Sequence, residues 1–186
     1  MIPDGGTFVR PGVIAWDGLL AAAAGTARDP GYPPCELVEQ AIARALDDED
    51  AVDAMLAELA RARLWLPLPA GPRPVTDGSA ITVPVLTCAG VAFVPAFTSV
   101  DRLVGWADPR QRRRDHRDGP VRAGDPAWLH DLGASAPAGT RTCRHVVVPL
   151  RGLASRLPAG TGIAVNPGTA LSVRLCPDAV GVFAGP

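Results

Sequence analysis

Lysine is missing from this chain of 186 residues, and all 18 of its basic residues are arginine. A phosphate-binding loop of the Walker type needs a lysine on the phosphates, so nucleotide hydrolysis by that route is excluded. Aromatic residues are also scarce, at 5% of the chain, and the arginine-rich run Arg110–Arg117 contains no Phe, Trp or Tyr to stack on bases. The net charge of −1 gives no overall attraction to nucleic acid. We therefore predict no nucleic-acid partner.

Cysteine and histidine are few and widely spaced. No C-x-x-C pair or finger-type spacing joins Cys35, Cys88, Cys143 and Cys176. The closest approach of a thiol and an imidazole is Cys143 to His145, with His130 or Asp131 available in principle to orient them, but only Arg144 would lower the thiol pKa. We predict no catalytic residues, no metal site and no cofactor, and reduced thiols of the kind found in the cytoplasm.

Long hydrophobic runs are absent as well. The apolar stretch 13–24 is about a dozen residues long and contains Asp17, whereas about 20 residues are needed to span a bilayer. The basic segment that opens a signal peptide is also weak, because Arg10 is opposed by Asp4. We therefore predict a cytoplasmic protein with no membrane partner.

The chain does have ample apolar material, at 47% hydrophobic residues with a mean hydropathy of +0.15. This amount and the chain length favour one folded domain. Residues 1–34 mix Pro, Gly and Ala with little periodicity, which predicts a flexible leader with at most a short helix over 16–24. The domain is predicted over 35–186, with a charged, mobile insertion at about 108–141. The abundance of Ala, Gly, Pro and Arg is typical of GC-rich coding and carries no functional signal.

Periodicity and turn signals predict an α/β (α+β) fold: a single mixed sheet with hairpins, covered by several helices. Helices are expected over 36–46, over a following segment capped by Asp50, over 98–106 and over 150–157. Strands are expected over 64–68 and 146–148, with hairpins formed by 81–87 with 91–97 and by 162–165 with 171–175. Pro84 and Pro95 within the first hairpin indicate an edge strand or a bulge, because proline lacks the N–H of a central strand.

Two short motifs lie where strands end. Thr98, followed by Asp101 three residues later, resembles a capping box that would start a helix. Asn166-Pro167-Gly168 has the composition of a type II turn, with Pro at its first corner and Gly supplying a positive φ. Both motifs have a structural explanation. Alternatively, the helix start and the turn lie together at one end of the sheet and hold a small anion or a partner's chain.

These motifs also carry a resemblance to a known family. Leu64–Leu68, Val91–Ser99 with Asp101-Arg102-Leu103 behind it, and Val165–Gly168 resemble the signature of the SseB N-terminal domain family, over about residues 37–180 apart from the insertion. The resemblance implies an α/β fold, a bacterial cytoplasmic location and no catalytic residues to carry over. The leader and the arginine-rich insertion depart from the family pattern.

The sequence supports two hypotheses of function. The first is a non-enzymatic protein-interaction or accessory module whose partner is another protein. The second is a sensor of a small amino-acid-like or anionic ligand, or a cryptic enzyme. The candidate ligand or partner site common to both is Phe97, Thr98, Ser99, Asn166, Pro167 and Gly168.

Overall fold

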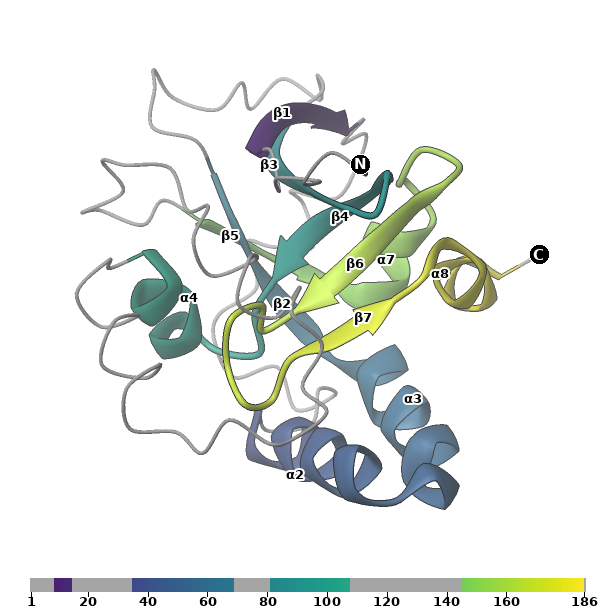
Figure 1. Cartoon of the computed structure of the whole chain (residues 1–186). Helices are drawn as coiled ribbons and strands as arrows, with labels where there is room; N and C mark the ends of the chain where they lie inside the picture. Colours follow the sequence, from purple (N-terminus) through teal and green to yellow (C-terminus); the bar gives the residue numbers. More distant parts are fainter. Residues whose placement is uncertain (1–8, 15–34, 69–80, 108–144, 186) are drawn as a thin grey trace, which may run out of the picture.

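The computed structural model describes residues 9–14, 35–68, 81–107 and 145–185. Most of the predicted leader, the whole of the predicted insertion and Cys143 lie outside these ranges, as does the run Arg110–Arg117. The elements, shown in Figure 1, are β1 (Val9–Ile14), α2 (Cys35–Asp47), η1 (Glu49–Ala51), α3 (Val52–Arg61), β2 (Arg63–Pro67), β3 (Ile81–Cys88), β4 (Val91–Ala96), α4 (Val100–Ala107), β5 (His145–Pro149), α7 (Leu150–Ala154), β6 (Thr161–Val165), β7 (Val173–Leu175) and α8 (Pro177–Ala184).

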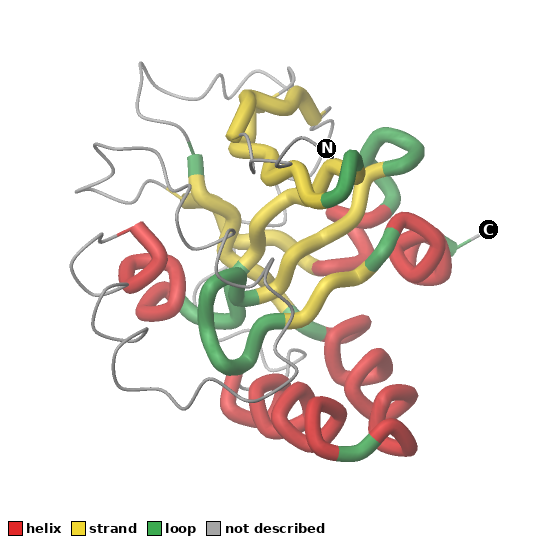
Figure 2. The backbone as a smooth tube through the Cα atoms, viewed as in Figure 1, coloured by secondary structure: helices red, strands yellow, loops and turns green. Residues whose placement is uncertain are grey.

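The α+β class is confirmed, but the strands form two sheets where the sequence predicts one. The larger sheet has the order β1-β3-β4-β6-β7, in which only the β4–β6 pair is parallel. The smaller sheet pairs β2 with β5 in antiparallel register. Figure 2 shows the two sheets meeting near the carboxyl end of β4, where an isolated bridge joins Trp65 to Phe97.

Pro95 explains where the two sheets divide. The Ala96 carbonyl faces β6, whereas the Phe97 N–H and carbonyl face the other side and pair with Trp65 of β2 at 3.0 and 2.8 Å. Pro95, two residues before Phe97, faces that same side and has no N–H to offer. The ladder between β3 and β4 therefore ends at Phe93.

The predicted edge position of the two prolines is wrong as stated, because β3 and β4 are inner strands. Both prolines nevertheless lie beyond the ladder that these strands share, which joins Leu86–Cys88 to Val91–Phe93. The outer edge beside β3 is taken by β1, which pairs with it along six residues. The sequence predicts no strand there, so part of the segment interpreted as a leader belongs to the sheet.

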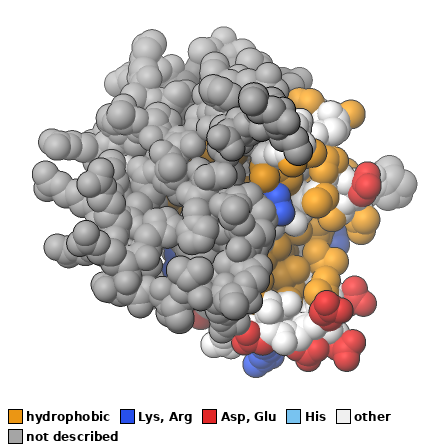
Figure 3. Space-filling model, viewed as in Figure 1, with side chains coloured by type: hydrophobic (Ala, Val, Ile, Leu, Met, Phe, Trp, Pro, Cys, Tyr) orange, Lys and Arg blue, Asp and Glu red, His pale blue; other side chains and the backbone are white. Residues whose placement is uncertain are grey.

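The first two helices form an antiparallel pair at the lower right of Figure 1. They bury Val38 and Ile42 from α2 and Met55 and Leu59 from α3, as their periodicity predicts. The predicted cap is wrong: Ala51 is the N-cap residue of α3 and makes no side-chain cap, whereas Asp48 caps η1 by accepting the Asp50 backbone N–H at 3.0 Å. Acidic side chains gather on the surface over this turn (Figure 3).

The later helices differ from prediction at their ends. Helix α7 has Pro149 as its N-cap residue and ends at Ala154. Leu157, which the predicted helix over 150–157 includes, therefore lies beyond it. The helix α8 is not predicted, although Pro177 at its start and the apolar Val180 and Phe183 are ordinary helix signals.

The core has two parts on opposite faces of the larger sheet. Alternate residues of β4 divide between them, with Val94 and Ala96 in the first and Phe93 in the second. The first part packs against α2, α3, α7 and α8, and the second packs against α4. Among the described residues, α4 is therefore the helix that covers the smaller part.

Candidate functional site

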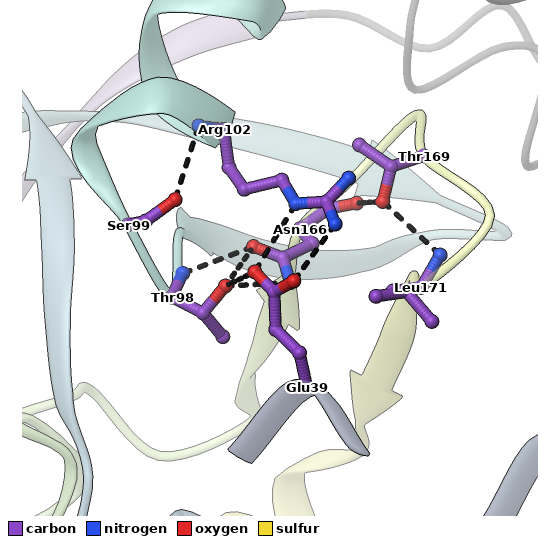
Figure 4. A network of polar contacts seen from close by, with 7 residues as sticks. All are labelled: Glu39, Thr98, Ser99, Arg102, Asn166, Thr169 and Leu171. Atoms are coloured by element: carbon purple, nitrogen blue, oxygen red, sulfur yellow. Dashed lines mark hydrogen bonds and ion pairs between the residues drawn. The ribbon is translucent and has the colours of Figure 1, made fainter. Parts of the chain in front are cut away.

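The parallel strands β4 and β6 end side by side, and the residues just beyond their ends meet. The Asn166 backbone N–H donates to the Ala96 carbonyl at 2.8 Å, continuing the parallel ladder by one step. The Thr98 backbone N–H then donates to the Asn166 side-chain oxygen at 3.0 Å, and the Asn166 Nδ2 donates to the Thr98 hydroxyl oxygen at 3.0 Å. Both residues are buried. Figure 4 shows this pair at the centre of a polar network.

The network continues from Thr98 into the helices α2 and α4. The Thr98 hydroxyl donates to Glu39 Oε1 at 2.5 Å. The Arg102 guanidinium holds both oxygens of the same carboxylate, with Nε to Oε1 at 3.1 Å and Nη2 to Oε2 at 2.8 Å. These contacts, foremost those of Arg102, lower the pKa of Glu39 below its ordinary value, and together they outweigh the opposing effect of burial. Glu39 is therefore an anion at neutral pH that links α2 to α4 and to the segment after β4.

The N-cap of α4 lies one residue later than predicted. Ser99 is the residue whose hydroxyl accepts the Arg102 backbone N–H, at 3.3 Å, and whose carbonyl accepts that of Leu103, at 3.2 Å. Thr98 thus does not cap α4, since its hydroxyl contacts Glu39 and Asn166.

The turn predicted at 166–168 is present. The Thr169 backbone N–H donates to the Asn166 carbonyl at 3.3 Å, and Gly168 has φ +79°, as a type II turn requires at its third position. Asn166 itself has φ +48°, a left-handed conformation that asparagine tolerates better than most residues. This conformation directs the Asn166 side chain back under Thr98 (Figure 4).

A cleft of about 460 Å³ opens beside this network. Its walls come from the start of α2, from α4 and from the turn after β6, in the residues Cys35, Glu36, Glu39, Ser99, Asp101, Arg102, Gly105, Trp106, Pro167, Gly168 and Thr169. The cleft lies at the carboxyl ends of the only parallel strand pair among the described residues, the place where open α/β sheets commonly bind ligands.

The six residues singled out from the sequence divide between the cleft and the interior. Ser99, Pro167 and Gly168 line the cleft. Thr98 and Asn166 lie buried behind it, and Phe97 packs its ring on Trp106, with centroids 5.3 Å apart. The helix start and the turn therefore do lie together at one end of the sheet, while a ligand for them stays a prediction.

Sequence reasoning missed the charged wall of the cleft. Glu39 sits between the core positions Val38 and Ile42 of α2, and a charged residue beside a buried stripe is a signal for a partner elsewhere. Nothing in the spacing indicates that this partner is Arg102, 63 positions later.

The Cys35 thiol lines the cleft and is a potential nucleophile, but its surroundings disfavour the thiolate form. Burial raises the pKa of Cys35, and the neighbouring Glu36 carboxylate raises it further by hydrogen bonding and by charge. Cys35, Cys88 and Cys176 are all free thiols. Among the described residues, no group of three or more potential metal ligands comes together.

Residues 38–129 match the family model described as the SseB protein N-terminal domain. Residues 38–129 therefore belong to the SseB N-terminal domain family, as the resemblance predicts. The match includes most of α2 and all of β4 and α4, and so both Glu39 and Arg102. It ends before the turn at Asn166, which the resemblance seen in the sequence also covers.

No curated protein and no solved structure matches the chain. None of the helices in the described ranges is long and apolar enough to cross a membrane.

Proposed function

We propose that this SseB domain is a non-enzymatic binding module that accepts part of another protein in the cleft between α2, α4 and the turn after β6. The observation that carries the proposal is the way in which the cleft is built. Its walls are fixed to one another by the hydrogen bonds of Glu39, Thr98, Arg102 and Asn166. A site held in shape before its ligand arrives loses little conformational entropy on binding.

The reactive groups around the cleft favour binding over chemistry. The Cys35 thiol has a raised pKa, the Ser99 hydroxyl caps α4, and the Thr98 hydroxyl is buried. Glu39 is the one carboxylate bonded to a hydroxyl in the network, but its lowered pKa makes it a weak base. The two hydroxyls therefore serve the fold, and neither Cys35 nor Glu39 is activated for chemistry.

The surface next to the cleft favours a protein over a small molecule. Val100 and Val104 form an exposed apolar stripe on α4, with exposed fractions of 39% and 48%, beside the cleft residues Asp101 and Gly105. Apolar side chains that adjoin a polar cleft are typical of protein interfaces. We place this interaction in the cytoplasm, where the free thiols of the chain would stay reduced.

Site-specific photocrosslinking tests the proposal. A benzophenone side chain introduced at Val104, beside the cleft, should give a discrete adduct with one partner in cells. The same group at Val182, which is 79% exposed on α8, is the control for surface labelling. Equal labelling at both positions, or no adduct at Val104 under any growth condition, would contradict a protein partner at the cleft.

A small-molecule sensor is the second candidate, because a volume of about 460 Å³ is in the range of small-ligand sites. A thermal-shift screen against amino acids and small anions distinguishes it. A ligand at about 100 times its Kd should add about 2.7 kcal/mol of stability. A ligand that protects the chain and also abolishes the crosslink at Val104 would favour the sensor.

A further inference from the structure

We draw no further inference here: the strongest candidate, the apolar stripe that Val100 and Val104 expose on α4, adjoins the cleft of the proposed function, and nothing in the part of the chain that the structure describes shows what covers it.

Discussion

Thr98 and Asn166 form the hydrogen bonds that hold the candidate site together. The Thr98 hydroxyl donates to Glu39 and accepts from Asn166, so a single oxygen connects α2 to the turn after β6. The Asn166 side chain in turn accepts the Thr98 backbone N–H, which has no strand partner beyond the end of β4. Each buried polar group in such a network needs a hydrogen-bond partner, because a group that loses its partner destabilises the folded state.

Thr98→Val should therefore lower the free energy of unfolding by about 1–3 kcal/mol, because valine has the same shape but leaves the Asn166 amide and the Glu39 carboxylate without that contact. Urea unfolding followed by circular dichroism measures the change. Thr161→Val, at the start of β6, is the matched control and should stay within about 0.5 kcal/mol of the wild type. An unchanged midpoint for Thr98→Val would show that this network adds nothing to stability.

Gly162 illustrates a close approach that only glycine allows. A Cβ at this position of β6 would lie 2.6 Å from the Leu175 carbonyl oxygen and from two ring atoms of Phe93. We expect Gly162→Ala to lower the unfolding free energy by about 1–3 kcal/mol through overpacking. Gly105→Ala, in α4 with open space around it, should instead raise it by about 0.5–1 kcal/mol because alanine is the better helix former. Calorimetric melting of both variants tests this: the melting temperature should fall for Gly162→Ala and rise for Gly105→Ala.

At the scale of elements, the ion pair between Glu39 and Arg102 joins two helices that share no long contact surface. Helix α2 packs against α3 and the larger part of the core, whereas α4 packs against Phe97 and its neighbours on the other face. The Glu39 side chain bridges the two at the mouth of the cleft. The shape of the cleft therefore depends on the charge of Glu39.

The lowered pKa of Glu39 makes this link sensitive to pH. A carboxyl group with a lower pKa in the folded state than in the unfolded state adds stability that is complete above its ordinary pKa of 4.5 and is lost as pH falls through the folded value. The unfolding free energy should thus decrease from pH 6 to pH 3. This decrease should be smaller in Glu39→Gln than in the wild type. Urea midpoints across this range measure the effect, and identical slopes for the two proteins would contradict it.

At the scale of the whole molecule, the two parts of the core share the strands β4 and β6. In β6, Ile163 and Val165 face the larger part and Ala164 faces the smaller one. A strand that loses its packing on one face therefore also loses it on the other. The described residues should consequently unfold as one unit.

Leu59→Ala in the larger part and Leu103→Ala in the smaller part test this expectation, since both side chains are fully buried. Each variant should lose about 2–5 kcal/mol of unfolding free energy. Tryptophan fluorescence and far-ultraviolet circular dichroism should report one common transition in each case. Separate transitions for Leu103→Ala would show that α4 and its side of the core unfold independently.

The sequence by itself determined the elements whose signals are local. Helices α2 and α3 follow from apolar residues at helical spacing, and the turn at Asn166 follows from the backbone preferences of Pro167 and Gly168. It also identified three residues that line the cleft, because strand ends and helix starts have recognisable compositions.

Only the tertiary structure decided which elements became neighbours. The division into two sheets, the strand β1 beside β3 and the pairing of Glu39 with Arg102 all depend on contacts between residues far apart in the sequence. A charged residue such as Glu39 has the same local signal wherever its partner lies. The partner is chosen only when the folded chain brings residues of α2 and α4 to the same cleft.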